Sequence, residues 1–236
     1  MSESPETLHA RGRAALLAGE ERLDVPPSTS GTRWGLSIVL RPDEALARRL
    51  AEETEALADL AGPGQWCTGG PGSCHVTVRT LEPYREPVTT KDQRTAGYVA
   101  VLRRAAARCG PVSLQMRGLV LTPGGVLAAA VPLDPTADGL RESVLHELAG
   151  DDFEGGYRGR VWWASLVHFA TPVLRRRELV DRVESRRETD FGVLAASRAD
   201  LVRYQYECTA GGGRTVPVTL VSAALVSRDD GDGPSA

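Results

Sequence analysis

Hydrophobic residues follow two different spacings along the middle of the chain, and each spacing predicts a different element. Leu46, Leu50 and Leu57 recur at helical intervals, whereas β-branched and apolar runs are typical of strands. A Thr-Pro-Gly-Gly segment between two apolar runs indicates a β-hairpin. The first half therefore predicts a strand at 34–40, a helix at 43–60, a strand at 74–81 and a helix at 91–109. A hairpin of strands 112–121 and 126–131 follows.

The same order of elements starts again in the second half of the chain. It predicts a helix at 134–148, a strand at 161–171 and a helix at 173–187. Three further strands follow, at 191–196, 201–208 and 216–226. Glycine-rich loops at 62–72 and 155–159 precede the strands that carry a histidine. We therefore expect an α+β fold of two pseudo-symmetric lobes around a central cleft. Each lobe has an antiparallel sheet with flanking helices, and the histidine-bearing strands face each other across the cleft.

The two ends of the chain differ from this pattern. Residues 1–30 predict an N-terminal extension, with a short helix over 8–19 that the following Val-Pro-Pro-Ser-Thr-Ser-Gly segment breaks. Residues 31–227 form the expected two-lobed domain. The polar, glycine-rich segment 228–236 predicts a disordered tail.

Charge and cysteine content narrow the class of protein. The 236 residues carry 28 basic and 31 acidic side chains, so the net charge of 28 − 31 = −3 excludes a generally basic surface for nucleic acid and leaves room for a local basic cleft. Four cysteines are too few for a disulfide scaffold of this size. The polar start and the lack of a long apolar stretch predict a cytoplasmic protein with reduced thiols and no membrane association.

Two histidines occupy corresponding places in the two halves, each on a predicted strand. Alternation along a strand places His75, Thr77 and Arg79 on one face, which is too polar for a core and suits the wall of a cleft. The same rule groups His168 with Trp162, whose ring is a candidate for stacking on a nucleobase. We therefore expect these five side chains to meet in the cleft.

A pair of imidazoles suits general acid–base catalysis. An unperturbed pKa of about 6.5 lets one ring take a proton from an attacking water while the other protonates a leaving oxygen. The Thr77 hydroxyl can hydrogen bond a phosphoryl oxygen, and the Arg79 guanidinium can offset its charge. In-line displacement on a strained cyclic phosphodiester needs no metal, so no metal or cofactor is expected.

The segment Cys-His-Val-Thr-Val-Arg at 74–79 resembles the first histidine motif of the 2H phosphoesterase superfamily, and His-Phe-Ala-Thr at 168–171 resembles the second. Members include the bacterial RNA 2′,3′-cyclic phosphodiesterase or 2′-5′ RNA ligase-like enzymes, and the order of elements matches over roughly 33–226. The resemblance implies that His75 and His168 are the catalytic acid and base and that Thr77 binds the phosphate. The expected substrate is a small cyclic nucleotide or an RNA end, with no obligate protein partner evident.

The second motif departs from the family pattern. Ala170 stands where the family usually has a hydroxyl, and Thr171 comes one residue late, so a regular strand would point it the other way. A bulge at 171–172 would redirect Thr171 toward a phosphate, which makes it a further candidate. Without that hydroxyl, three outcomes remain open: weaker phosphate binding, a different substrate, or no catalysis.

Alternative interpretations of the same residues also stay open. His75 and His168 can be structural histidines, Trp162 a core residue, and Arg79 a surface residue. Cys67 with Cys74 and His75 lacks the usual spacing of zinc ligands. The alternatives to a cyclic phosphodiesterase are a non-catalytic module that binds nucleotides or RNA ends, and a phosphodiesterase specialised for a small metabolite.

Overall fold

The computed structural model describes residues 4–29, 31, 33–150, 153–154, 161–209 and 212–226. It has the α+β composition that the sequence predicts. The helices are α1 (Pro5–Ala18), α2 (Glu44–Ala61), α3 (Gln93–Ala106), α4 (Thr136–Leu148) and α5 (Arg176–Ser185). The strands are β1 (Ser37–Leu40), β2 (Trp66–Cys67), β3 (Val76–Thr80), β4 (Val112–Thr122), β5 (Gly125–Pro132), β6 (Trp162–His168), β7 (Asp190–Ala196), β8 (Arg198–Thr209) and β9 (Gly212–Ala224).

Helix α2 shows how local sequence fixes an element and its buried face. The Asp43 side chain accepts a hydrogen bond from the Leu46 amide at 2.8 Å, which caps the helix start. Leu46, Leu50 and Leu57 are at most 1% exposed, as the helical spacing predicts. In α3, Asp92 performs the same capping role.

The strands of the described residues belong to one sheet, in the order β2-β9-β8-β1-β3-β6-β5-β4-β7. An additional pairing of β2 with β6 closes the strands from β2 to β6 into a barrel, and β5, β4 and β7 continue outward from β6. All pairings are antiparallel except that of β2 with β9. The histidine-bearing strands β3 and β6 therefore lie in the middle of one continuous sheet.

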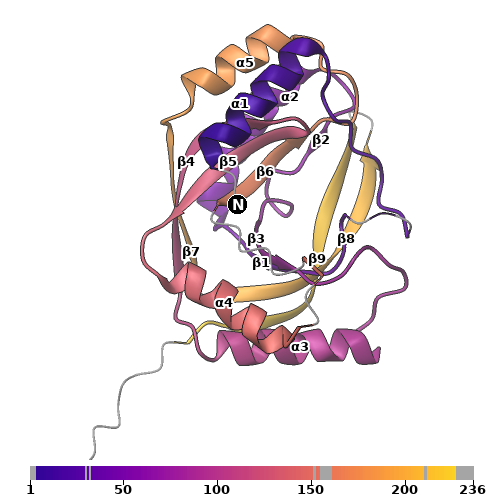
Figure 1. Cartoon of the computed structure of the whole chain (residues 1–236), viewed down its shortest axis with the longest axis vertical. Coiled ribbons are helices and arrows are strands. Elements are labelled where there is room, and N and C mark those ends of the chain that lie inside the picture. The colour runs from indigo at the N-terminus through magenta and orange to yellow at the C-terminus, as the bar shows by residue number, and fades with distance from the viewer. Residues whose placement is uncertain are drawn as a thin grey trace, which may run out of the picture.

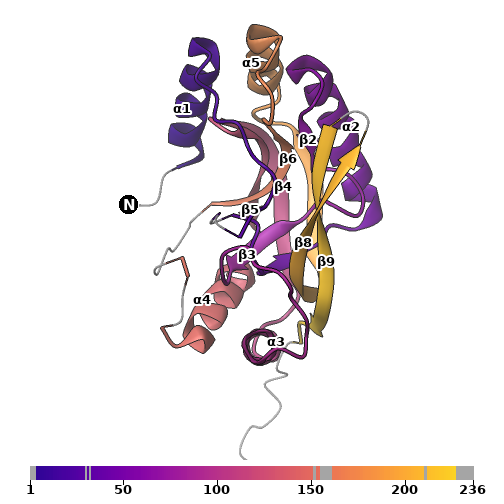
Figure 2. The ribbon, with the colours of Figure 1, turned by 90° about the vertical axis from the view of Figure 1, so that its right-hand side faces the viewer.

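The helices gather at two ends of the molecule. Figures 1 and 2 show α1, α2 and α5 at one end and α3 and α4 at the other, with the strands between them. Helix α2 packs on α5, β6 and β7, and α4 packs on α3 and β4. No helix among the described residues is long and apolar enough to cross a membrane.

The strand β2 lies inside the segment that the sequence predicts as a glycine-rich loop. Its Trp66 pairs with His168 of β6 and with Gly213 of β9. The chain just beyond β2 passes so close to α2 that a Cβ on Gly69 would come within 2.0 Å of the Thr54 hydroxyl. Glycine at 69 therefore lets this segment close the barrel beside His168.

The predicted N-terminal extension packs onto the domain. A Cβ on Gly12 would lie 2.5 Å from the backbone of Leu121, so glycine permits α1 to lie directly on β4. After α1, the Arg22 amide donates to the Pro123 carbonyl at 2.7 Å and the Asp24 amide to the Phe169 carbonyl at 2.6 Å. This segment therefore runs beside the end of β6. The predicted loop 155–159 and tail 228–236 lie outside the described residues.

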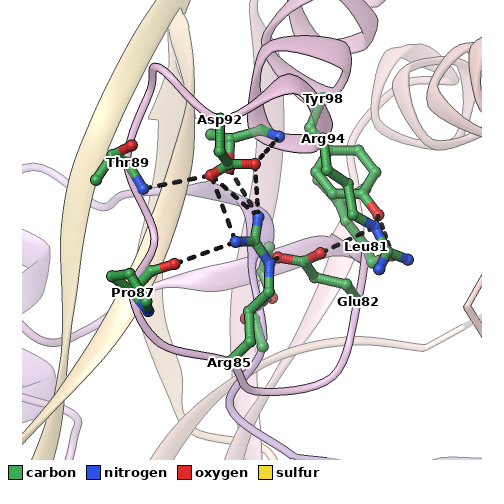
Figure 3. Close-up of polar contacts among 11 residues, drawn as sticks. Leu81, Glu82, Arg85, Pro87, Thr89, Asp92, Arg94 and Tyr98 are labelled. Atoms are coloured by element: carbon green, nitrogen blue, oxygen red, sulfur yellow. Dashed lines mark hydrogen bonds and ion pairs between the residues drawn. The ribbon is translucent and has the colours of Figure 1, made fainter.

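A buried polar network fixes the loop between β3 and α3 (Figure 3). The Glu82 side chain is fully buried and accepts from Arg85 Nε at 2.7 Å. Arg94 Nε lies 3.2 Å from its other oxygen, and Arg85 also donates to the capping residue Asp92 at 3.1 Å. The loop is thereby tied to the start of α3, and its Tyr84 borders a small hollow next to Trp34 and Tyr204.

Candidate active site

The two histidines lie at the ends of neighbouring strands. His75 directly precedes β3, and His168 is the last residue of β6. The sequence predicts that these strands face each other across a cleft, but they share the antiparallel pair Val76–Ala164, beyond which β6 turns to pair with β2. The imidazoles are close enough for the charge of His168 to act on His75.

Both ring nitrogens of His75 have defined partners. Nδ1 lies 2.7 Å from the Ser73 carbonyl, which can only accept, so Nδ1 carries the proton. The neutral Nε2 then accepts from the Tyr204 hydroxyl at 3.0 Å. Burial lowers the pKa of His75 to about 4, against the effect of the Ser73 hydrogen bond, and the Arg41 and His168 charges lower it further.

Arg41 holds the turn that precedes His75. Its guanidinium donates to the Gly72 carbonyl at 3.3 Å, to Asp200 Oδ2 at 3.0 Å, and to the Pro217 carbonyl at 2.6 Å. These bonds fasten the turn to β8 and β9, so the carbonyl that orients His75 lies on a fixed support. Sequence reasoning missed Arg41, because its partners come from three distant parts of the chain.

A bulge in β6 decides which way His168 points. Val126 pairs with Val167 and Leu127 with Ser165, so Leu166 is an extra residue without its own partner on β5. Simple alternation predicts that His168 shares a face with Trp162. The extra residue shifts His168 to the side of Trp163 and Ser165 instead, and all three line one cavity.

Trp162 therefore lies outside the site, contrary to the sequence-based expectation. It is 1% exposed, and its indole nitrogen donates to Asp138 of α4 at 3.0 Å. The guanidinium of Arg141, which is also on α4, lies 3.5 Å from the centre of the Trp162 ring. Trp162 thus joins β6 to α4, and Trp163 is the tryptophan that borders the cavity.

A carboxylate from the N-terminal segment lies beside His168. Its Nδ1 lies 3.0 Å from Asp24 Oδ2, and Asp24 is in turn paired closely with Arg33. Arg33 lies directly against Asp24 and offsets its charge. Burial is the main reason that the pKa of His168 falls to about 3, and the Arg33 and Arg22 charges add to the effect.

Aromatic side chains connect the two imidazoles. The Trp34 ring lies edge-on to His168 with centroids 5.0 Å apart, and edge-on to Tyr204 at 5.6 Å. Tyr204 in turn packs on His75 at 5.4 Å. Trp34 has a φ of 66°, a left-handed conformation that residues with a side chain seldom adopt outside functional or strained sites. The chain turns at Trp34 so that its ring enters the space between the histidines.

Thr77 lies beside the same hydroxyl cluster. Burial raises the pKa of Tyr204, whereas hydrogen bonds with the Ser37 and Thr77 side chains act in the opposite direction. Thr77 and Arg79 both line a second cavity of about 160 Å³. Arg79 is 1% exposed there and its guanidinium lies 3.0 Å from Glu154 Oε2. The structure thus brings Thr77 to the hydroxyl that contacts His75 and pairs Arg79 with an acidic side chain.

Thr171 follows the end of β6 and faces a different loop. Its hydroxyl donates to the Pro63 carbonyl at 2.8 Å. The Gln65 side chain accepts from the Ala170 amide at 2.9 Å and holds this turn in place. The bulge that the sequence suggested at 171–172 lies instead at Leu166, so it turns His168 rather than Thr171.

The cysteines near the first motif do not form a metal site with the histidines. Cys67, Cys74 and His75 belong to no group that could hold a metal ion within the described part of the chain. Cys74 is buried, and burial raises the pKa of its thiol to about 12. A thiol in that environment stays protonated at neutral pH and is a poor metal ligand.

Three residues beside His168 escape prediction from the sequence. Asp24, Arg33 and Trp34 belong to no motif that could mark them in advance, since only the folded chain places them next to the ring. Asp24 lies in the segment that the sequence predicts as a peripheral extension. The one available signal was the position of Trp34 at the start of a predicted strand, which does not distinguish a site residue from a core residue.

Comparison with known proteins supports this fold. The sequence matches no family model and no curated protein. Among solved structures, TT0787 of Thermus thermophilus superposes with a TM-score of 0.57 at 19% identity, over 82% of this chain and 99% of that one. A protein described as a phosphoesterase gives a TM-score of 0.51 at 12% identity, over 82% and 99%.

Escherichia coli LigT complexed with 3′-AMP gives a TM-score of 0.52 at 12% identity, again over 82% of this chain and 99% of that one. At such identities the likeness establishes the fold. The chain thus shares the fold of these solved structures, which include LigT and a protein described as a phosphoesterase.

Proposed function

We propose that the protein is a metal-independent phosphodiesterase that hydrolyses a 2′,3′-cyclic phosphate of a nucleotide or an RNA end. The observation that carries this proposal is the matched setting of the two histidines. Nδ1 of His75 lies on the Ser73 carbonyl and Nδ1 of His168 beside the Asp24 carboxylate, which leaves Nε2 as the acid–base nitrogen of each ring; on His75 that nitrogen accepts from the Tyr204 hydroxyl in the ligand-free protein.

One imidazole takes a proton from water as the water oxygen forms a bond to phosphorus. The bond from phosphorus to the 3′ oxygen breaks, and the other imidazole, in its protonated form, gives its proton to that oxygen. The product is a 2′-phosphate, and each histidine ends in the state from which the other began. Thr77 holds a non-bridging oxygen, with the Tyr204 hydroxyl beside it.

Substrate binding generates the protonated histidine. Both pKa values are low in the ligand-free protein, at about 4 for His75 and about 3 for His168, so both rings are neutral at neutral pH. A phosphodiester anion between the rings favours the charged form of one of them. Substrate binding therefore takes up a proton and creates the acid that the reaction needs.

The direct test is turnover of the four nucleoside 2′,3′-cyclic monophosphates in excess EDTA. We expect wild-type turnover, and loss of it in His75→Ala and in His168→Ala, each checked for folding by circular dichroism. His146→Ala is the matched control, because His146 lies exposed on α4. Turnover that survives either site substitution contradicts the two-histidine mechanism.

Absence of turnover in a folded wild-type protein would favour the two alternatives. Ala170 gives them a physical basis, because the second motif lacks the usual hydroxyl and offers a backbone amide that Gln65 already occupies. Tight binding of a nucleoside 2′-phosphate without turnover would indicate a binding module. Turnover of a non-nucleotide phosphodiester alone would indicate a specialised enzyme.

We also propose two lobes related by approximate twofold symmetry and a cytoplasmic setting. Each half supplies a helix, a histidine-bearing strand, a helix and paired strands in the same order, and β3 and β6 meet at the centre of the sheet. The four cysteines are free thiols in the structure, as expected in a reducing compartment.

A further inference from the structure

A cavity of about 280 Å³ lies against His168, and the side of it that the N-terminal segment forms includes arginines. Arg11 of α1 and Arg22 and Arg33 of the following segment line this side. The cavity is also lined by apolar side chains: Leu127 of β5, Val161 just before β6, and Trp163 of β6. Within the described part of the chain no acidic side chain lines it.

Positive charge is in excess at this wall. Asp24 pairs with Arg33, whereas Arg22 and Arg33 both lie near enough to lower the pKa of His168. Arg22 also contributes, after burial, to lowering the pKa of Arg33 to about 10. Like charges held together at a cavity are stabilised by an anion, and guanidinium groups match the oxygens of a phosphate.

We propose that this cavity is a second phosphate subsite, which takes the phosphate on the 5′ side of the nucleoside whose cyclic phosphate reacts. The inference rests on the proposed function, because His168 marks where the cyclic phosphate lies. Arg22 and Arg33 hold the second phosphate, and the apolar wall with Trp163 accommodates the ring or sugar attached to it.

The size of the cavity limits the ligand. Its volume of about 280 Å³ is just below the roughly 300–1,000 Å³ usual for ligand pockets, which limits the occupant to at most one nucleotide-sized unit. A long RNA would need basic surface well beyond this wall, and the whole chain has a net charge of −3. The expected substrate class is therefore a 5′-phosphorylated nucleoside cyclic phosphate or the end of a short oligonucleotide.

The test compares three substrates. They are adenosine 2′,3′-cyclic phosphate, the same compound with a 5′-phosphate, and the dinucleotide ApA with a 2′,3′-cyclic end. We expect kcat/KM for the second and third compounds to exceed that for the first by about tenfold or more, since charge-assisted hydrogen bonds to a phosphate are strong. The 5′-phosphorylated mononucleotide isolates the phosphate, and the dinucleotide adds the neighbouring nucleoside.

Substitution of Arg22 shows whether the cavity causes the preference. Arg22→Gln is expected to bring the ratio of the kcat/KM values close to one, and Arg22→Lys to retain part of it. Arg48→Gln is the matched control, because Arg48 is 67% exposed on α2 and pairs with Glu44. It should leave the ratio unchanged.

Equilibrium binding separates failure of this inference from failure of the proposed function. We expect adenosine 3′,5′-bisphosphate to bind about tenfold or more tightly than 3′-AMP, and Arg22→Gln to remove the difference. Equal affinities for the two ligands, or a difference that Arg22→Gln preserves, would overturn the subsite whether or not the protein turns over a cyclic phosphate. Absence of turnover with an Arg22-dependent preference would overturn the proposed function alone.

Discussion

Two neutral histidines, His168 buried and His75 half-buried, make the folded state sensitive to mild acid. The pKa of a histidine in an unfolded chain is about 6.5, whereas burial lowers that of His75 to about 4 and that of His168 to about 3. Below pH 6.5 the unfolded chain therefore binds protons that the folded chain does not. This stabilisation is fully present above pH 6.5 and is lost as the pH falls toward the folded-state values.

The size of the effect follows from these pKa values. Lowering the pH from 7.0 to 5.0 reduces the free energy of unfolding by about 2 kcal/mol for each of the two histidines. A total of about 4 kcal/mol is a large part of the 5–15 kcal/mol that usually stabilises a protein. Most carboxyl groups titrate below this pH window, so the histidines dominate the change.

Urea unfolding at pH 7.0 and pH 5.0 measures this loss. We expect His75→Gln and His168→Gln each to lose about 2 kcal/mol less than the wild type over this interval, because glutamine stays neutral. His146→Gln, on the exposed face of α4, should lose as much as the wild type. Burial also lowers the pKa of His9, which adds a background common to all four chains. Equal losses in the wild type and both site variants would refute the reasoning.

Three further substitutions test separate parts of the structure. Asp24→Asn should lower kcat/KM by about 10- to 100-fold and shift the pH profile of kcat/KM, because Asp24 positions His168. An unchanged pH profile would argue against that role. Thr77→Val should lower kcat/KM about tenfold or more with little change in the midpoint of urea unfolding. A variant as active as the wild type would exclude phosphate binding by the Thr77 hydroxyl. Glu82→Ala should reduce the free energy of unfolding by about 1–2 kcal/mol, because it removes the hydrogen bond from Arg85 and empties a fully buried position; Glu44→Ala, at an exposed pair, should cost less than about 0.5 kcal/mol, and similar costs for the two would contradict this account.

Local sequence could predict the elements because their signals are local. The Asp43 cap and the leucine spacing specify α2, and the Thr-Pro-Gly-Gly turn specifies the β4–β5 hairpin, without reference to the rest of the chain. The two-residue strand β2 has no such signal, since Trp66 and Cys67 become a strand only through pairing with β6 and β9. Closure of the barrel therefore could not be read from the sequence.

Motif resemblance could single out candidate site residues but not their arrangement in the fold. The motif resemblance pointed to His75, Thr77 and His168, which the structure gathers around one aromatic and hydroxyl cluster. Strand alternation then failed for Trp162, because the bulge at Leu166 depends on pairing with β5. Asp24 lies far from His168 in the chain, and no local pattern reports a contact that only tertiary packing creates.

The arrangement of the N-terminal segment bears directly on the proposed acid–base chemistry of the two neutral imidazoles. Asp24 lies against His168, burial keeps that ring neutral, and the Arg33 and Arg22 charges from the same segment add to the effect. A phosphate on these arginines offsets their charge, and a second phosphate at the histidines raises their proton affinity. The contact with Asp24 and part of the positive field that lowers the pKa of His168 thus come from one stretch of chain, so substitutions in this segment should change the rate and the pH dependence of the proposed reaction.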